Sequence, residues 1–511
     1  MKPVKLIVTN KSKLEWKYGK KLSKINSLLK QMQAADKKKG LDTRVAFVDN
    51  AASLKSAGVK KINTDAAKEY KRVVDDLYKK YTPAYIVILG ASDIVPFQLI
   101  DNPAEDEDAT VESDLPYACD MPYSKNITNF TGPTRVVGRI PDIMGKQDDI
   151  TYLQKVITNS INHMPLSVEK YYNYFSVTAL VWKKSTELSL QSIFGQSTKM
   201  TSAPHGKIPK SYTPYSKREL SPLTHFYNCH GASFDLSFYG QKGNQYPEAL
   251  QSSNLSNNIA PGTIVASECC YGAQLFDPKQ QGLPQQGIGT NYLANDAIAF
   301  LGSSTIAYGP ADSQGLADLI TQFFIKNILT GSSTGRAFLE ARQRFLTEVG
   351  PDLDPFELKT IAQFYLLGDP SVQPAECEEA EVVSLSVGTA IANSRKNLFM
   401  KGITLAGSIG VTKKLQNASP LTTKLPLSNN KTMNADDILQ ANKFNRDDKK
   451  AVYSVKPKAT GFMGLQKKFG GNNVKYHTYV QNPMKKIKHI RILVVKENSS
   501  QILGWKVYES R

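Results

Sequence analysis

Apolar positions in the first hundred residues follow two alternating patterns. Residues 4–10, 43–50 and 84–97 are short, nearly continuous apolar runs, whereas residues 16–37 and 66–81 carry apolar side chains at helical spacing. Continuous runs of this length are typical of strands buried on both faces, and helical spacing indicates amphipathic helices. The alternation predicts a parallel sheet covered by helices, which is an α/β fold.

The same alternation returns further along the chain after irregular stretches. Residues 101–133 are acidic and rich in turn formers, which predicts a surface loop, and residues 183–222 are polar, which predicts a mobile insertion. Further strands are expected at 134–143, 171–182, 223–231, 261–272, 298–310 and 362–374, and further helices at 149–163, 313–329 and 334–349.

The last quarter of the sequence has a different pattern. After residue 381 the apolar residues alternate over short segments, at 382–387, 475–480, 490–495 and 504–510. Short alternating strands separated by Asn, Gly and Lys turns predict a β-sandwich-like domain. We therefore expect an N-terminal α/β subdomain at 1–150, a second α/β subdomain at 151–375 and a β-rich domain at 381–511.

The positive charge of the protein is concentrated in this β-rich domain. Residues 381–511 hold 23 Lys and Arg against 7 Asp and Glu, while the other residues hold 41 and 39. Lysine is a hydrated point charge, suited to diffuse attraction rather than to reading bases. We interpret the domain as having a solvated basic face, with binding of nucleic acid as the alternative.

Nothing in the sequence predicts secretion or a membrane. The first ten residues lack the apolar stretch of about 7–15 residues that a signal peptide needs, and no run approaches the roughly 18 apolar residues of a membrane span. The five cysteines have no paired metal-ligand spacing. We expect a cytoplasmic location, reduced thiols, no metal centre and no organic cofactor.

Two expected strands end at a reactive side chain that glycine follows. The first ends at His230-Gly231, and the second ends at Cys270-Tyr271-Gly272. Ligands of open parallel sheets bind at the carboxyl ends of the strands, so neighbouring strands would bring imidazole and thiol together. An imidazole can generate the thiolate nucleophile and then return the proton to a leaving amine. The backbone N–H groups of Gly231 and Cys270 could form an oxyanion hole.

Other interpretations of these residues remain open. A buried histidine or cysteine is usually structural, and Cys269 is an alternative nucleophile because adjacent side chains in a strand face opposite sides. The ordered pair of strand ends favours the dyad of His230 and Cys270.

Taken together, these segments resemble the caspase-like cysteine peptidases. The similarity is greatest to the gingipain family, through VILGASDIVPF, the ESD and VVGRIP segments, FLGSSTIAYGP and FYLLGDPSVQP, over roughly residues 80–375. The resemblance implies a caspase-like sheet and a thioester acyl-enzyme formed on protein or peptide substrates. It also implies that Asp114 and Glu268 line the S1 pocket, which predicts cleavage after Arg or Lys.

Two other functions and the binding of one ion remain possible interpretations of the sequence. The chain could be a non-catalytic caspase-like scaffold or adaptor, or a nucleic-acid-binding protein that uses its basic domain. Some related enzymes bind calcium, and the acidic residues 105–114 could hold a structural ion or could be plain solvated surface.

Overall fold

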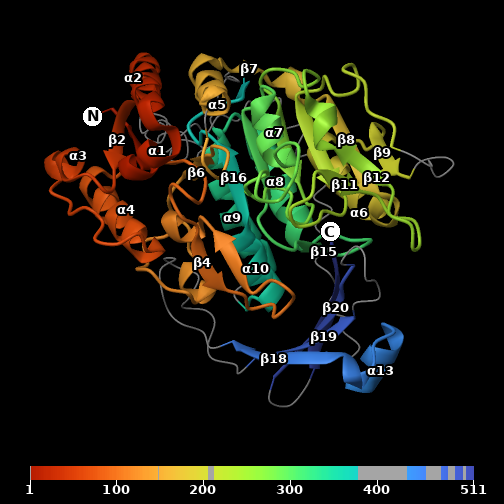
Figure 1. The fold of residues 1–511 in the computed structure, drawn as a ribbon. Helices are drawn as coiled ribbons and strands as arrows, with labels where there is room; N and C mark the ends of the chain where they lie inside the picture. Colours follow the sequence, from red (N-terminus) through yellow and green to blue (C-terminus); the bar gives the residue numbers. More distant parts are fainter. Residues whose placement is uncertain are drawn as a thin grey trace, which may run out of the picture.

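A large central sheet with helices on both faces makes up most of the molecule (Figure 1). The computed structural model describes residues 2–147, 149–204, 212–350, 352–377, 434–455, 474–481, 489–498 and 502–511. A smaller antiparallel sheet, built from the last part of the chain, lies below the central sheet in Figure 1. The α/β fold with a mostly parallel sheet flanked by helices is thereby confirmed.

The central sheet has ten strands within the described residues. In spatial order they are β2 (Asp42–Phe47), β1 (Val4–Thr9), β3 (Tyr85–Leu89), β6 (Val137–Ile140), β16 (Phe364–Gly368), β14 (Ala299–Ser303), β13 (Ile264–Ser267), β10 (Thr224–Asn228), β8 (Tyr174–Ala179) and β9 (Met200–Ala203). Strands from 1–150 and from 151–375, which the sequence divides into two subdomains, are thus joined in one sheet.

The strand directions place the carboxyl ends of five neighbouring strands at one edge. All pairings between neighbours in this sheet are parallel except that of β14 with β16. Strands β14, β13, β10, β8 and β9 therefore run together, opposite to the other half of the sheet. Their shared carboxyl edge is where ligands of parallel sheets bind.

The helices form two rows that cover the sheet. In one row α2, α5 and α7 pack against one another in series, and in the other α6, α8, α9 and α10 do so. The helices are α1 (Lys11–Tyr18), α2 (Leu22–Lys38), α3 (Ala51–Leu54), α4 (Ala67–Tyr81), α5 (Thr151–Asn162), α6 (Lys183–Phe194), α7 (Ile288–Ala294), α8 (Leu316–Leu329), α9 (Thr334–Val349), α10 (Pro355–Gln363) and α13 (Ala435–Ala441).

Alternating side chains of the strands supply a separate apolar core on each face. In β13, Val265 belongs to one apolar cluster, whereas Ile264 and Ala266 belong to the other. Because successive side chains of a strand point to opposite faces, a strand between two helix layers must be apolar throughout. This requirement explains the continuous apolar runs in the sequence.

The C-terminal sheet includes one short strand, β15 (Tyr308–Gly309), from residues 151–375. Its strands are β15, β21 (Ile502–Ser510), β20 (Arg491–Glu497), β19 (Val474–Gln481) and β18 (Lys449–Val455), in that order and all antiparallel. The described part of the expected β-sandwich-like domain is this single sheet with helix α13. The strand expected at 382–387 lies outside the described residues.

Smaller pairings complete the fold. They join β4 (Gln98–Asp101) with β5 (Thr110–Ser113), β11 (Ser237–Tyr239) with β12 (Glu248–Gln251), and β7 (Leu166–Ser167) with β17 (Ala375–Glu376). Strand β5 and the last residue of β4, Asp101, lie within residues 101–133, which the sequence predicts to be a surface loop.

The expectation of a mobile insertion at 183–222 was wrong for its first part. Helix α6 and the edge strand β9 occupy residues within it. The buried face of α6 consists largely of hydroxyl side chains, including Ser185, Thr186 and Ser189. Small hydroxyl groups pack closely and bond to buried partners, so this helix has no apolar stripe that periodicity would detect.

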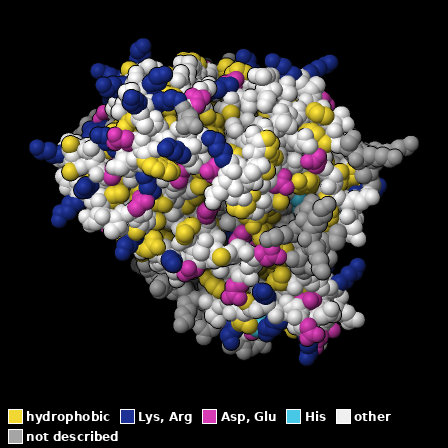
Figure 2. Space-filling view, in the orientation of Figure 1, with side chains coloured by type: hydrophobic (Ala, Val, Ile, Leu, Met, Phe, Trp, Pro, Cys, Tyr) yellow, Lys and Arg dark blue, Asp and Glu magenta, His cyan; other side chains and the backbone are white. Residues whose placement is uncertain are grey.

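Charged side chains of both signs are interspersed on the visible surface (Figure 2). Among the described residues, no helix combines the length and the apolar character that a membrane crossing would require.

Gly335 shows how tightly helix α9 packs on the sheet. An added Cβ would lie 2.3 Å from Cβ of Pro370 and 2.6 Å from a methyl carbon of Val136. Alanine in place of a helical glycine normally stabilises by about 1 kcal/mol. We expect Gly335→Ala instead to lower the free energy of unfolding by about 1–3 kcal/mol, because overpacking dominates. Urea denaturation measures this, with Ser27→Ala on the exposed side of α2 as the control; a more stable Gly335→Ala protein would contradict it.

Candidate active site

The two reactive strand ends lie side by side. Strand β10 pairs in parallel with β13, with Tyr227 opposite Ser267, and the N–H of Glu268 donates to the Tyr227 carbonyl oxygen at 2.8 Å. The chain then leaves the sheet through His230 and Gly231 on one strand and through Cys270 on the other. The sequence-predicted neighbours are therefore brought to one edge of the sheet.

Two backbone N–H groups at this edge converge on one oxygen atom. The N–H of Gly231 and that of Cys270 donate to the carbonyl oxygen of Arg511, over 3.4 and 3.1 Å. A Cβ on residue 231 would lie 1.9 Å from the Cys270 carbonyl oxygen, so only glycine fits there. Two preorganised donors aimed at one carbonyl oxygen have the geometry of an oxyanion hole.

The adjacent cysteines face opposite sides of the sheet. Cys269 is packed in the same apolar cluster as Cys229, whereas Cys270 belongs to the cluster on the other face. The Cys270 sulfur lies 3.3 Å from the N–H nitrogen and 3.4 Å from the carbonyl oxygen of Ala307. Burial raises the pKa of the Cys270 thiol, so the sulfur is protonated at neutral pH in this arrangement.

The His230 ring is oriented by a glutamine. Its Nε2 lies 2.7 Å from Oε1 of Gln241, and the Gln241 amide nitrogen donates to Gly243 and Tyr246. Since the amide nitrogen is used there, the oxygen faces the ring and Nε2 must carry the proton. This leaves Nδ1 as the basic nitrogen.

The same ring is held neutral by its surroundings. It packs against Trp182, with ring centroids 4.3 Å apart, and burial lowers the pKa of His230 to about 3. Among the described residues no hydrogen bond joins this ring to the Cys270 thiol, whose partners are the Ala307 groups. The imidazole and the thiol are both neutral, and each follows one of the two strands whose N–H groups contact the Arg511 backbone.

The Arg511 side chain is buried next to these groups, at 0% exposed, and we call the residues that enclose it the Arg511 pocket. One guanidinium nitrogen donates to the Pro310 carbonyl oxygen at 2.7 Å and to Asp318 at 3.1 Å. The guanidinium carbon lies 4.5 Å from the Trp182 ring centroid. A Cβ at Gly309 would come within 2.3 Å of the guanidinium, so glycine leaves the room that the cation fills.

Two acidic side chains stand at the base of this pocket. Glu268, predicted from the sequence, accepts a hydrogen bond from Thr321 at 3.2 Å, and burial together with the nearby Asp318 raises its pKa well above the usual range. Burial raises the pKa of Asp318 as well, but the Arg511 cation opposes that shift, so Glu268 is the protonated partner and Asp318 carries the charge that faces Arg511. Sequence reasoning missed Asp318, although it is an acidic residue in the otherwise mostly apolar helix α8.

Asp114, the other residue predicted for the S1 pocket, has a partner elsewhere. Its two carboxylate oxygens accept from Arg139 at 2.6 and 2.9 Å, and both side chains are buried. Arg139 also donates to the carbonyl oxygens of Gly90 and Val95. The structure thus brings Glu268 to the Arg511 pocket, while the Asp114 carboxylate is engaged by an internal arginine.

Two acidic residues of 105–114, Asp106 and Asp108, likewise bind a side chain of the protein. Asp106 and Asp108 both form salt bridges with Lys359, and they also accept from Tyr308 and Tyr271. The Lys359 ammonium lies between these two carboxylates. Within the described residues, no group of three or more His, Cys, Asp or Glu is arranged to hold a metal.

The ion pair of Asp114 with Arg139 leads to a stability prediction. Removing one partner of a buried pair costs about 3 kcal/mol or more. We expect Asp114→Asn to lower the free energy of unfolding by about this amount in urea denaturation. Asp101→Asn, an exposed change on the neighbouring strand β4, should leave stability unchanged. Equal stability of the two variants would exclude a structural role for Asp114.

Comparison with known proteins adds a family to this geometry. The model of peptidase family C25 matches residues 3–375, which include both strand ends and most of the pocket. No curated protein matches the sequence. A solved structure described as "Structure of Protease" is similar over 99% of this chain and 97% of that chain, with 12% identity and a TM-score of 0.45, a likeness too distant to carry an argument.

The family match extends the resemblance to the gingipain family, which the sequence indicates over roughly 80–375, to nearly all of the chain before the basic domain. The chain belongs to peptidase family C25, a family of cysteine-type peptidases.

Proposed function

We propose that this protein is an endopeptidase that cleaves after arginine, and more slowly after lysine, with Cys270 as the nucleophile and His230 as the proton carrier. One observation carries the proposal. An arginine residue is bound with its carbonyl oxygen on the Gly231 and Cys270 N–H groups and with its guanidinium against Asp318. A peptide substrate would be bound in the same way if its scissile bond followed arginine.

The proposed reaction uses these groups in turn. Nδ1 of His230 takes the proton of the Cys270 thiol, and the sulfur attacks the carbonyl carbon of the scissile bond. The N–H groups of Gly231 and Cys270 stabilise the oxyanion that forms. As the C–N bond breaks, His230 returns the proton to the leaving amine, and a thioester remains on Cys270.

Hydrolysis of the thioester uses the same residues in reverse roles. His230 removes a proton from a water molecule, whose oxygen attacks the thioester carbonyl carbon. The second tetrahedral intermediate releases the acid product, and the sulfur leaves with the proton that His230 carries. Because burial keeps both groups neutral, the thiolate forms as it attacks and is not present beforehand.

The pocket favours arginine over lysine for geometric reasons. A planar guanidinium can stack on Trp182 while it donates to both the Pro310 carbonyl oxygen and Asp318. An ammonium group has no flat face to stack on the Trp182 ring. Either cation is favoured over an acidic side chain, because Asp318 carries the charge of the pocket.

Reporter peptides with Arg, Lys or Asp before the scissile bond test the assignment of the pocket. We expect turnover to fall in that order. Asp318→Asn should lower kcat/KM for the Arg peptide by about a hundredfold, from loss of about 3 kcal/mol of charge pairing. Asp312→Asn, an exposed change just before α8, is the matched control.

Mass spectrometry of an arginyl chloromethyl ketone adduct identifies the nucleophile in the same preparation. Labelling at Cys270 supports the proposal, and Cys270→Ala provides the blank. Labelling at Cys269, or a preference for Asp peptides, would refute the corresponding part of the assignment.

The depressed pKa of His230 gives a pH prediction. A general base works only when unprotonated, and with Arg511 in the site burial lowers the pKa of His230 to about 3. Gln241→Glu places a negative charge beside Nε2, which favours the imidazolium and raises the pKa. The acidic limb of the kcat/KM profile should therefore move to higher pH in this variant.

The control for this experiment is Gln245→Glu, which introduces the same charge at an exposed position of the same loop. Its acidic limb should coincide with that of the unmodified enzyme. Identical profiles for Gln241→Glu and Gln245→Glu would show that Gln241 does not position the base.

A further inference from the structure

The last residues of the sequence reach the candidate site as an added strand. Strand β21 pairs antiparallel with β15, with Ser510 opposite Tyr308 and Glu509 opposite Gly309. The Arg511 N–H then donates to the Ala307 carbonyl oxygen at 2.9 Å. Figure 1 shows the C-terminus beside β15, between the central and C-terminal sheets. Addition of an extended peptide to an exposed strand is a common mode of peptide recognition.

Contacts on both sides of the backbone hold this segment in register with the site. The Arg511 side chain contacts Asp318 in the Arg511 pocket. The Arg511 carbonyl oxygen accepts hydrogen bonds from the N–H groups of Gly231 and Cys270. Two residues earlier, Glu509 accepts a hydrogen bond from Trp182 Nε1 at 3.0 Å. Trp182 therefore contacts the segment twice, through its ring face at Arg511 and through its ring nitrogen at Glu509.

Further contacts anchor β21 to the catalytic part of the molecule. The Tyr508 hydroxyl donates to Asp354 at 2.8 Å, and Lys506 forms a salt bridge with Glu357. Asp354 and Glu357 are the capping residues of helix α10. The strand that carries Arg511 is thus fastened to a rigid element close to the site.

With the segment in place the reactive groups are covered. His230 is 1% exposed and Cys270 is 3% exposed. At the same time, two of the three guanidinium nitrogens of Arg511, Nε and Nη1, have no hydrogen-bond partner among the described residues. Arg139, the buried arginine beside Asp114, donates through all three guanidinium nitrogens, so the Arg511 guanidinium is held by fewer hydrogen bonds, as an exchangeable occupant would be.

We propose that residues 508–511 are an internal occupant of the active site, in which Arg511 takes the position of the residue before a scissile bond. The enzyme is closed while β21 is paired with β15, and it opens when β21 is displaced. The assignment of Arg511 to the substrate position rests on the proposed function, whereas the covering of Cys270 does not. A tethered occupant acts at an effective concentration of about millimolar, so weak free peptides compete poorly.

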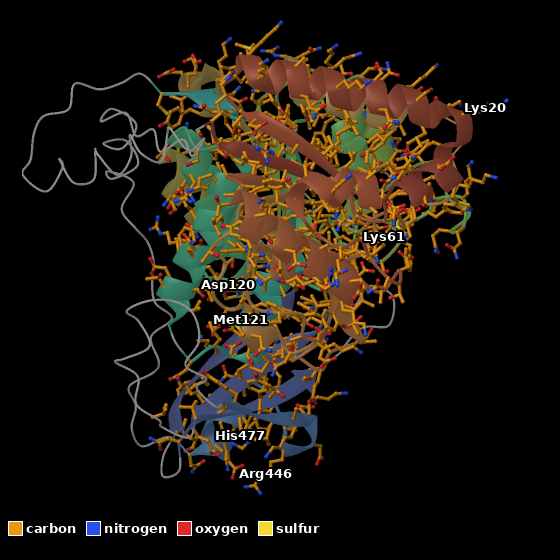
Figure 3. The ribbon with its side chains drawn as sticks, turned by 90° about the vertical axis from the view of Figure 1, so that its left-hand side faces the viewer. Lys20, Lys61, Asp120, Met121, Arg446 and His477 are labelled. Atoms are coloured by element: carbon orange, nitrogen blue, oxygen red, sulfur yellow. The ribbon has the colours of Figure 1, made fainter. Side chains whose placement is uncertain are left out.

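Alkylation of Cys270 by iodoacetamide, followed by mass spectrometry on the chain of residues 1–511, tests the closure without relying on peptidase activity. Arg511→Gln should be alkylated at Cys270 at least tenfold faster than the unmodified protein, and Arg511→Lys should remain slow. Arg446→Gln removes the same charge from an exposed site at the outer end of the C-terminal sheet (Figure 3) and should have no effect.

The other buried cysteines report on folding in the same samples. Cys229 and Cys269 lie in the opposite core, so they should stay unreacted if Arg511→Gln opens only the site. Addition of the free peptide Tyr-Glu-Ser-Arg to Arg511→Gln should slow alkylation again. The peptide Tyr-Glu-Ser-Gln should not.

The outcomes separate the two proposals. Equal rates of Cys270 alkylation in the unmodified protein and in Arg511→Gln would overturn the closure. So would faster alkylation of Cys229 and Cys269 together with Cys270, because it would indicate a general loss of structure. Faster alkylation of Cys270 without turnover of an Arg reporter peptide would support the covering of the site by residues 508–511 and refute the peptidase function. Faster alkylation with at least tenfold greater turnover supports both.

Discussion

The parallel pairing of β10 with β13 is the constraint on which the site depends. It ends both strands at the same edge and aims the N–H groups of Gly231 and Cys270 at one oxygen. The approach is so close that residue 231 has no room for a side chain. His230 and Cys270 are neighbours of these N–H groups in the chain, so the donors and the reactive side chains are set by one pairing.

The charges in the Arg511 pocket are balanced. Two buried carboxyl groups lie together, and burial keeps one of them, Glu268, protonated. One negative charge then faces one guanidinium, which avoids the cost of two uncompensated buried charges. The same principle applies at Asp114 with Arg139 and at Lys359 with Asp106 and Asp108, where acidic residues near the site are neutralised by cations of the protein itself.

The C-terminal sheet connects these features to the rest of the chain. Its strand β21 extends β15 by ordinary antiparallel pairing and delivers Arg511 to the pocket. Much of the basic domain lies outside the described residues, but its last strand is an integral part of the site. The position of Arg511 is therefore more informative about the role of this domain than its net positive charge.

The sequence by itself determined the α/β fold, the two reactive strand ends and the presence of Gly231 beside His230, because burial and sharp turns constrain which residues a strand and its end can contain. It did not reveal helix α6, whose buried face is rich in hydroxyl groups. It also gave no sign of Gln241 as the partner of His230, since a glutamine in a turn carries no distinctive pattern. Asp318 and Arg511 are separated by almost two hundred positions from each other, and only folding could bring them together. Asp114 and Glu268 are both acidic residues in segments that carry the family resemblance, and the sequence does not distinguish them. Only the tertiary structure decided that Asp114 pairs with Arg139 and that Glu268 lies beside Asp318. The physical reason is that the neighbours of a buried carboxylate come from distant parts of the chain.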